Sequence, residues 1–415
     1  MDRLGEAHPP AVSRHSTAGA LPVVLASFFA IGLGAAGVNL MGYLTPYIQE
    51  DLGIGRARAG AVVGLYFGGT GFGALAAGRI VALLGTRRSV AFGLTALATL
   101  SSCVAAFGNY LFLIAFGIVC GFGYAVTTVG TNVAVAAVVS PTRRALGLTG
   151  KTSGGPLFSA TFALIAGLTV DHIGWRGVMA VHGACAAIAL IGAMVALRRA
   201  DVRPGERRAT SLKPVPRIVI AVALGSFLLA AGAQAFFSWL LPFLKDGMGL
   251  SSEKAGVMTA SATATSLVGM LSTAVLADRL GARGRVLLLA SLAVSSGLAA
   301  IVMANADGVG LIVVGAAAMV GIAAYAAASG LMHTVTVDLA PDSIERASAR
   351  VITGFFLGAW VSPIAFGWVT DHSGFSAAWL TSAGFLCAAA VTYYLCHRSQ
   401  QNTTRPLEVP WPASA

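Results

Sequence analysis

From Ser89 to Thr142 the chain reads SVAFGLTALATLSSCVAAFGNYLFLIAFGIVCGFGYAVTTVGTNVAVAAVVSPT, a stretch without Asp, Glu, Lys or Arg. Apolar runs longer than about 18 residues are typical of helices that span a membrane. The turn residues Gly108-Asn109-Tyr110 divide the stretch, which therefore predicts two spanning helices joined by a short turn. Charged residues are also absent from His15 to Gln49 and from Gly308 to Val337.

The composition of the whole chain agrees with a membrane location. Hydrophobic residues make up 56% of the 415 residues and charged residues only 10%. A soluble domain usually carries about 25% charged residues. The composition therefore excludes a soluble enzyme, a nucleic-acid-binding protein and a disulfide scaffold as the main interpretation.

The net charge of +11 follows the membrane topology. Counted outward from the predicted spans, 22 Lys and Arg residues fall on one side and 5 on the other. Loops rich in Lys and Arg stay in the cytoplasm. The bias predicts a multi-pass protein of the cell membrane with both termini in the cytoplasm, and it requires no nucleic-acid partner.

We predict an all-α membrane protein with twelve transmembrane helices in two six-helix halves. The first run is too long for a cleaved signal peptide. The predicted spans are 21–46, 59–84, 89–107, 111–139, 147–170, 177–197, 218–244, 255–277, 286–304, 308–337, 347–370 and 377–397. The domains are a cytoplasmic segment 1–20, a half 21–197, a cytoplasmic linker 198–217, a half 218–397 and a cytoplasmic tail 398–415.

The two halves repeat one another. At an offset of 196, Pro46 corresponds to Pro242 and Gly53 to Gly249. Further along the offset becomes 200, and the pairs then include Gly121 with Gly321, Gly154 with Gly354, and Asp171-His172-x-Gly174 with Asp371-His372-x-Gly374. Repeated halves are the architecture of many secondary transporters, with the substrate site between them near the middle of the bilayer.

The loop between the second and third helices of each half resembles the signature of the major facilitator superfamily, Gly-x-Leu-Ala-Asp-Arg-x-Gly-Arg-Arg. The second half reads Leu276-Ala277-Asp278-Arg279-Leu280-Gly281-x-Arg283-x-Arg285, and the first reads Gly78-x-Ile80-Val81-Ala82-x-x-Gly85-x-Arg87-Arg88. The resemblance implies a cytoplasmic gate, for which the candidates are Arg87, Arg88, Asp278, Arg279 and Arg283. Ala82 replaces the acid in the first half, so that half lacks the acidic member of the signature.

Within the superfamily the chain is similar to the monocarboxylate and oxalate/formate-type branch. This resemblance rests on Arg143-Arg144-Ala145-Leu146-Gly147-Leu148-Thr149-Gly150, Gly154-Gly155-Pro156 and Gly174-Trp175-Arg176. Gly117 stands where proton-coupled drug and sugar carriers of the family often have an arginine.

The resemblance implies a central cavity lined by the first, fourth, seventh and tenth spans. These spans carry polar residues at helical spacing, which are costly against lipid and should face water or one another. The substrate-binding candidates on them are Asn39, Tyr43, Tyr124, Thr128, Gln234, Trp239, Tyr325, Ser329 and His333. Hydrogen bonding between helices is the alternative explanation of the same pattern.

Lys151 and Arg350 lie within predicted spans and complete the substrate-binding candidates. A basic residue at mid-bilayer costs about 2.5–3.5 kcal/mol or more, which favours a functional role. The repeat offset places the two at similar depth in opposite halves, a pattern suited to a carboxylate substrate. Alternatively both side chains extend to the cytoplasmic boundary, and Arg350 pairs with Asp338 or Glu345.

His333 is the first candidate for proton coupling because histidine titrates near physiological pH; Asp338 is the second. No predicted span holds an acidic residue at mid-depth, which counts against an acid-driven cation antiporter. The chain contains no Walker A motif, so accumulation would depend on an ion gradient or on exchange.

The sequence thus predicts a secondary transporter that moves a small organic anion, a monocarboxylate or aromatic acid, by alternating access and with protons. We expect no enzyme activity, cofactor or metal. The expected partners are the substrate, a proton or counter-ion, and the lipid bilayer. One alternative is a proton-driven efflux pump with an aromatic lining (Tyr43, Tyr66, Trp239, Trp360). The other is a membrane sensor or scaffold, for which the terminal segments are too short.

Overall fold

The computed structural model describes residues 17–140, 143–200 and 214–403, and the regular elements in these ranges are all helices. The helices of the first half are α1 (Thr17–Tyr43), α2 (Thr45–Leu52), α3 (Arg56–Leu84), α4 (Thr86–Phe107), α5 (Tyr110–Ala115), α6 (Gly121–Val138), α7 (Arg144–Thr152) and α8 (Gly154–Ala196). Those of the second half are α9 (Ile218–Ser238), α10 (Leu240–Pro242), α11 (Ser252–Asp278), α12 (Ala282–Ala304), α13 (Leu311–Leu339) and α14 (Ile344–Thr403).

Among the described residues, nine helical segments are long and apolar enough to cross a membrane. Three of them, Arg56–Phe107, Leu146–Ala196 and Arg346–Gln400, are 51 to 55 residues long. A straight helix of that length would extend about 77–83 Å, more than twice the hydrocarbon core. Each of the three folds back on itself and counts as two spans, which confirms the predicted twelve.

Glycines make two of these reversals possible. Inside α8 the chain turns at Gly174, and inside α14 at Gly374, with φ angles of 68° and 81°. Residues with a side chain rarely adopt such positive φ values. The repeated Asp-His-x-Gly segments of the sequence are therefore two matching hairpin turns between spans.

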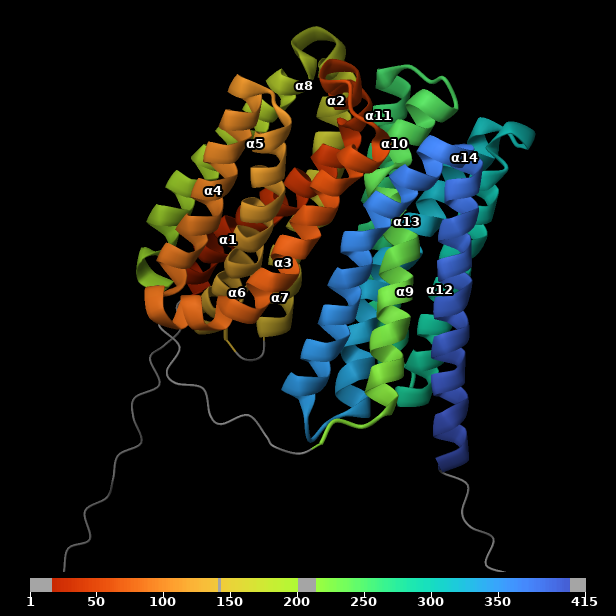
Figure 1. The fold of residues 1–415 in the computed structure, drawn as a ribbon. Helices are drawn as coiled ribbons and strands as arrows, with labels where there is room; N and C mark the ends of the chain where they lie inside the picture. The colour runs from red at the N-terminus through yellow and green to blue at the C-terminus, as the bar shows by residue number, and fades with distance from the viewer. Residues whose placement is uncertain (1–16, 141–142, 201–213, 404–415) are drawn as a thin grey trace, which may run out of the picture.

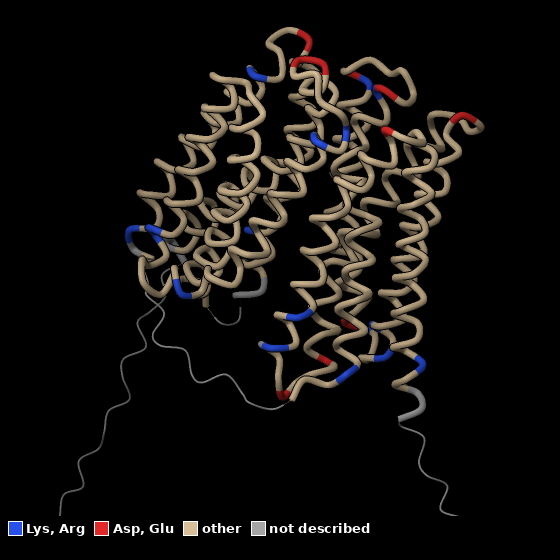
Figure 2. Tube along the Cα trace, viewed as in Figure 1, with Lys and Arg blue, Asp and Glu red and all other residues tan. Residues whose placement is uncertain are grey.

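The helices form two groups, one from each half, that lean together at one end of the molecule (Figure 1). The two groups are farther apart at the other end, where the described chain begins and ends. We call these the closed end and the terminal end. The charged residues gather at the two ends, and the long middle of the bundle is almost free of them (Figure 2).

Glycines bring the two halves into contact near the closed end. A side chain on Gly256 of α11 would lie 2.5 Å from Cα of Gly167 in α8. In the same way, a side chain on Gly42 of α1 would lie 2.5 Å from the carbonyl oxygen of Ser238 in α9. Small residues allow such close approach between membrane helices. Backbone packing thus holds the halves together at this end.

The predicted domain boundaries fall at the edges of the described ranges. Most of the proposed linker, residues 201–213, lies outside them, as do residues 1–16 and 404–415 of the two terminal segments. The described part of the last helix continues to Thr403, beyond the predicted end of the span at 397.

Candidate substrate cavity and gates

A cavity of about 250 Å³ lies between the two halves. Eight predicted spans contribute to its wall, four more than the family resemblance implied. The first half supplies Ile31, Ala35, Val38, Asn39, Tyr66, Phe67, Tyr124, Thr152, Gly155, Pro156 and Ser159, and the second supplies Gln234, Phe237, Ser266, Met270, Tyr325, Ala326, Ser329 and Phe355. Five of the predicted substrate-binding residues line it, namely Asn39, Tyr124, Gln234, Tyr325 and Ser329.

Two hydrogen bonds fix the amide side chains in this wall. Asn39 Nδ2 donates to Ser159 Oγ at 2.9 Å, which joins α1 to α8. The Tyr325 hydroxyl donates to Gln234 Oε1 at 2.9 Å, which joins α13 to α9. Both bonds lie within one half of the protein, so each half brings a preformed polar surface to the cavity.

Aromatic rings form much of the remaining wall. In the first half the Tyr66 and Tyr124 rings lie 6.1 Å apart. In the second half Tyr325 stacks on Phe355 at 6.1 Å and 14°, and Phe237 packs against Tyr325 at 5.9 Å. Flat aromatic groups pack favourably against such surfaces. Sequence patterns missed Phe237 and Phe355 because apolar side chains leave no polar stripe.

The Tyr124 hydroxyl makes no hydrogen bond to any described residue, although its ring lines the cavity. By contrast, the Tyr66 hydroxyl donates to the Gly34 carbonyl at 2.7 Å. A phenol can both donate and accept a hydrogen bond. Tyr124 thus presents a polar group that is free for a ligand.

Lys151, at the end of α7, is only 2% exposed. Its Nζ atom donates to Thr131 Oγ1 at 2.9 Å and, at 3.4 Å, to the carbonyl oxygen of Thr128. No described carboxylate forms an ion pair with it. An ammonium group has three donors, so one remains unmatched. Lys151 does not line the cavity, but the next residue, Thr152, does, and Thr128 lies one helical turn from the lining residue Tyr124.

The prediction that Lys151 and Arg350 occupy equivalent positions in the two halves needs correction. At the offset of 200 the counterpart of Lys151 is Val351, which is fully buried, whereas Arg350 is exposed. Consecutive helical residues point about 100° apart, so Arg350 does not repeat the position of Lys151. The counterparts of Thr131 and Thr128 are the buried Leu331 and Ala328. Among the described residues, the buried positive charge therefore belongs to the first half alone.

The two proton-coupling candidates have different surroundings. His333 of α13 is exposed and lies one turn beyond Ser329, on the side of the helix that lines the cavity. Asp338 accepts hydrogen bonds from Arg285 Nη1 at 2.9 and 3.1 Å. Arg285 also donates to the Ala277 carbonyl at 2.9 Å. Asp338 therefore belongs to an ion pair that ties together the ends of α11, α12 and α13.

Three other candidates do not line the cavity. Tyr43 and Trp239 are almost fully buried toward the closed end, where Trp239 Nε1 donates to the Pro363 carbonyl at 3.1 Å. The Thr128 hydroxyl donates a hydrogen bond to the Tyr124 carbonyl of the same helix at 2.8 Å. Their polar groups serve helix packing, the alternative that the sequence left open for the whole set.

The gate candidates of the signature loops lie at the terminal end. Arg87 Nε donates to the Met194 carbonyl at 3.1 Å, within the first half. Arg88, Asp278, Arg279 and Arg283 are exposed. Of the two acids nearest this loop, Asp338 rather than Asp278 pairs with Arg285. Asp278 instead lines a second cavity of about 250 Å³, to which Thr149 of the first half also contributes.

A gate that sequence reasoning did not identify joins the halves at the closed end. Arg56 of α3 lies 3.6 Å from Asp371 and 3.7 Å from Asp246 of the second half. Asp371 also accepts a hydrogen bond from the backbone N–H of Ala57 at 3.1 Å. Burial raises the pKa of Asp246, while Lys245 and Arg56 oppose this shift. The first turn of α3 is thus held by carboxylates from the other half.

The repeat produces a matching contact on the other side of the same end. Asp171 Oδ1 accepts from Ser252 Oγ at 2.9 Å, in the first turn of α11, and Ser252 accepts from the Tyr47 hydroxyl at 2.6 Å. Burial raises the pKa of Tyr47 to about 12, so the phenol stays neutral and can donate. The duplicated Asp171 and Asp371 were the sequence signal for this gate.

A family model described as Major Facilitator Superfamily matches residues 24–344 and 222–413 of the chain. A Haemophilus influenzae protein, described provisionally as a metabolite transport protein, is 26% identical over 278 residues. The match covers 62% of this chain and 68% of that relative.

Solved transporter structures share the fold at low sequence identity. A bacterial homologue of the human lysosomal transporter Spinster, inward-facing and unoccupied, aligns with a TM-score of 0.74 at 16% identity, over 94% of this chain and all of that one. A D-xylose–proton symporter aligns with a TM-score of 0.70 at 14% identity, over 90% and 97% of the two chains. A nucleoside transporter gives a TM-score of 0.74 at 13% identity, over 91% and 99%.

Proposed function

The chain belongs to the Major Facilitator Superfamily of transporters, and from this premise we propose that it carries a small organic anion, a monocarboxylate or aromatic acid, across the membrane with protons. The transporter works by alternating access, in which the two halves open the central cavity first to one side and then to the other.

The observation that carries the anionic substrate class is the buried, unpaired Lys151. A buried cation is costly unless a negative group compensates it. The described spans offer no such group, Nζ of Lys151 has a spare donor, and the adjacent residue Thr152 lines the cavity. A bound carboxylate supplies the missing negative charge. The resemblance of residues 143–156 to the monocarboxylate and oxalate/formate-type branch agrees with this assignment.

The shape of the cavity supports an aromatic or otherwise flat acid. Its two aromatic surfaces, Tyr66–Tyr124 and Tyr325–Phe355, come from opposite halves. A ligand between them would contact both halves at once and draw them together. The Tyr124 hydroxyl and the Asn39 side chain supply hydrogen bonds that fix its orientation.

His333 is the candidate for proton coupling that remains free of an ion pair among the described residues. It lies beyond Ser329 on the path from the cavity to the terminal end. Histidine can exchange a proton with water near neutral pH. Substrate and proton would then leave through the same opening.

We further propose that the protein resides in the cell membrane with its terminal end in the cytoplasm, since 22 of the 27 Lys and Arg residues fall on that side. The functional units remain the halves 21–197 and 218–397, with the linker 198–217 and the segments 1–20 and 398–415 on the cytoplasmic side. The structure then represents an inward-facing state.

Uptake of labelled carboxylates into proteoliposomes with an imposed pH gradient tests the proposal. We expect Lys151→Gln to lower uptake at least about tenfold, the factor that corresponds to about 1.4 kcal/mol. The melting temperature of this variant should be no lower than that of the unaltered protein, because the substitution removes an uncompensated buried charge. Lys254→Gln is the matched control, since Lys254 is an exposed lysine of α11.

Uptake by Lys151→Gln within twofold of the control would remove the lysine from the mechanism. Absence of uptake of every anion by the unaltered protein would overturn the substrate class.

An efflux pump for drugs or metabolites is the second candidate, favoured by the aromatic cavity walls. Expression in a host without its own efflux pumps distinguishes the two. Resistance to neutral or cationic compounds, without any carboxylate transport, would favour the pump.

A further inference from the structure

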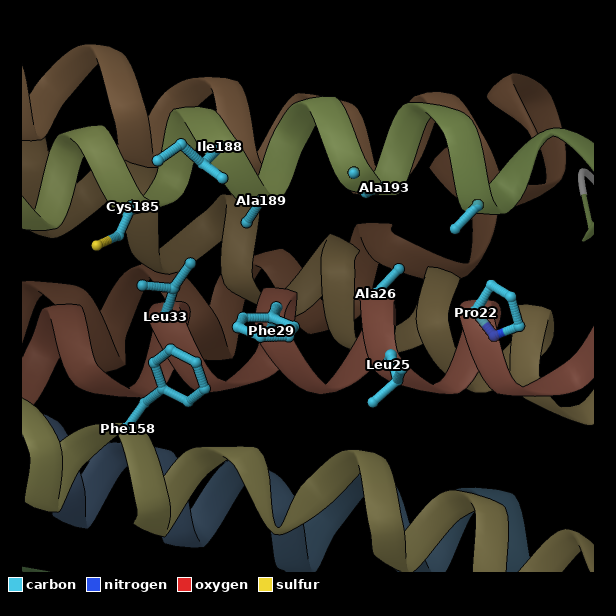
Figure 3. Close-up of a pocket in the computed structure, with 12 residues that line it drawn as sticks. Pro22, Leu25, Ala26, Phe29, Leu33, Phe158, Cys185, Ile188, Ala189 and Ala193 are labelled. Carbon is cyan, nitrogen blue, oxygen red and sulfur yellow. The ribbon is translucent and has the colours of Figure 1, made fainter.

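A long apolar groove runs along the outer flank of the first half, between α1 and the second span of α8 (Figure 3). Its volume is about 380 Å³, and none of its lining residues is charged. Pro22 and Leu33 of α1 lie near its two ends, Ala189 and Ala193 of α8 lie on the opposite wall, and Phe158 closes its inner end. Gly192 of α8 also lines the groove. The groove is separate from the substrate cavity, which lies on the other side of α1.

The groove is about as long as one leaflet of a bilayer is thick. Pro22 and Leu33 are separated by about 16 Å along a helix that rises 1.5 Å per residue. Half of a hydrocarbon core is about 15 Å. Pro22 lies in the first turns of α1 and Ala196 ends α8, so the groove begins at the terminal end and stops near the middle of the membrane.

The corresponding position in the second half is filled. At the offset of 200, Ala193 corresponds to Tyr393, which is fully buried. The Tyr393 ring occupies the space where Gly225 would carry a side chain, and its hydroxyl lies 3.1 Å from Ser226 Oγ. The fold therefore does not require a groove here, and the small residues of the first half create it.

Phe29 does not restore the lost volume. It corresponds to Gly225 at the offset of 196, so the two halves exchange a large and a small residue. The Phe29 ring packs edge to face on Phe158 at 5.3 Å and is 45% exposed. It therefore forms part of the groove wall, next to the buried Ala193, and leaves the space at Gly192 open.

Positive charge lies at the open end of the groove. Arg198 is exposed and follows Ala196 by two residues. Arg87 is half-buried nearby, where it holds the end of α8 through the Met194 carbonyl. Basic residues at this depth attract anionic lipid headgroups.

We propose that this groove binds one acyl chain of an anionic phospholipid from the leaflet at the terminal end, with the phosphate group beside Arg198. An apolar cavity inside the membrane-spanning region is filled by hydrocarbon rather than by water. The groove length matches a single leaflet, and the basic mouth selects the headgroup. This lipid site is independent of the proposed substrate, and its test measures no transport.

Native mass spectrometry of the full-length protein, purified from vesicles of equal parts phosphatidylglycerol and phosphatidylcholine, tests the site. Gly192 and Gly384 both have open space where a side chain would begin, and both are exposed on the last span of their half. Gly192→Leu fills the groove, and Gly384→Leu is the matched control. Each methylene withdrawn from an apolar site weakens binding about fourfold. Displacement of between one and two methylenes of the acyl chain by Gly192→Leu should therefore lower lipid retention about tenfold.

A second variant, Ala193→Tyr, copies the residue of the second half and should have the same effect. Arg198→Gln should keep the lipid but lose the preference for phosphatidylglycerol. Equal retention by Gly192→Leu, Ala193→Tyr and Gly384→Leu would overturn the site. Retention of a free fatty acid or another small molecule instead of a phospholipid would overturn the assigned occupant, and an equal preference for both lipids in the unaltered protein would overturn the role of Arg198.

Discussion

Single side chains decide what the cavity can hold. Tyr124 and Tyr325 both line it, but only the Tyr325 hydroxyl is bound, to Gln234. A hydroxyl that already has a hydrogen-bond partner in the protein stabilises the fold, whereas a hydroxyl without one can bind a ligand. The two tyrosines therefore allow the two effects to be measured separately.

Removal of the Tyr124 hydroxyl should affect transport more than stability. We expect Tyr124→Phe to raise the KM for a carboxylate substrate about tenfold, because a hydrogen bond to a charged group contributes about 1.5–3 kcal/mol. The melting temperature should stay unchanged. Tyr325→Phe should instead lower the free energy of unfolding by about 1 kcal/mol, since it leaves Gln234 Oε1 without its donor.

Uptake kinetics and thermal unfolding of the two variants provide the measurements. An unchanged KM in Tyr124→Phe would mean that this hydroxyl does not contact the substrate.

The sequence predicted a substantial part of this cavity. The polar stripes led to Asn39, Gln234 and Ser329 because polar atoms inside a membrane need polar neighbours. The same rule also selected Tyr43 and Trp239, which lie against Thr263 and Gly60 of the opposite halves near the closed end. Polarity alone cannot distinguish a wall of a cavity from a contact between halves, since the difference depends on how the halves meet.

At the scale of the helices, close packing through glycine determines which end is closed. Gly167 of α8 and Gly256 of α11 approach so closely that neither position has space for a methyl group. The sequence indicated only that glycines recur at matching positions in the two halves. Their function as a contact became visible once the helices were placed side by side.

We expect Gly256→Ala to push α8 and α11 apart and to open the closed end. Thr259 lies on the same buried side of α11 and is fully buried, so a cysteine there reports the opening. In a background without the native cysteines, the Thr259→Cys thiol should react with a water-soluble maleimide several times faster when Gly256→Ala is present.

Gly384→Ala is the control, because Gly384 has open space around it. Equal labelling rates in the Gly256→Ala and Gly384→Ala proteins would show that the helix contact does not control the opening.

The reversals at Gly174 and Gly374 also belong to the scale of the elements. The sequence placed span boundaries at 170 and 177, and again at 370 and 377, and the structure confirms turns between them. It did not indicate that Asp171 and Asp371, just before these turns, reach the first turns of α11 and α3 in the opposite half. The repeat marked the two acids, but it could not identify their partners, because these contacts join distant parts of the chain.

In the whole molecule, the gate at the closed end stabilises one arrangement of the two halves over the other. We expect Asp371→Ala to increase the population of molecules that are open at this end about fivefold. The estimate follows from about 1 kcal/mol for a partly exposed ion pair. Spin labels at Asn109 and Asn305, exposed positions of the two halves at this end, should then show a larger share of long distances.

Asp307→Ala removes an exposed acid at the same end and is the control. The same distance distribution in both variants would exclude Asp371 from the gate.

The twelve-span architecture was predictable because twelve apolar segments and a repeated sequence leave few alternatives. The difference between the halves was harder to predict. The repeat suggested two equivalent cations, but the structure has a buried Lys151 in one half and a buried Val351 in the other. Similar backbones can carry different chemistry, since a single position decides whether a charge lies inside.

The buried charge of Lys151 bears on how the transport cycle responds to membrane voltage. With a carboxylate bound beside Lys151 and a proton on the carrier, the central region of the loaded carrier holds one net positive charge. The empty carrier holds the same net charge, from Lys151 alone. Moving one elementary charge through the full field is worth about 2.3 kcal/mol per 100 mV. Under the proposed mechanism, membrane voltage therefore acts equally on the loaded and the empty carrier, and a full cycle moves no net charge.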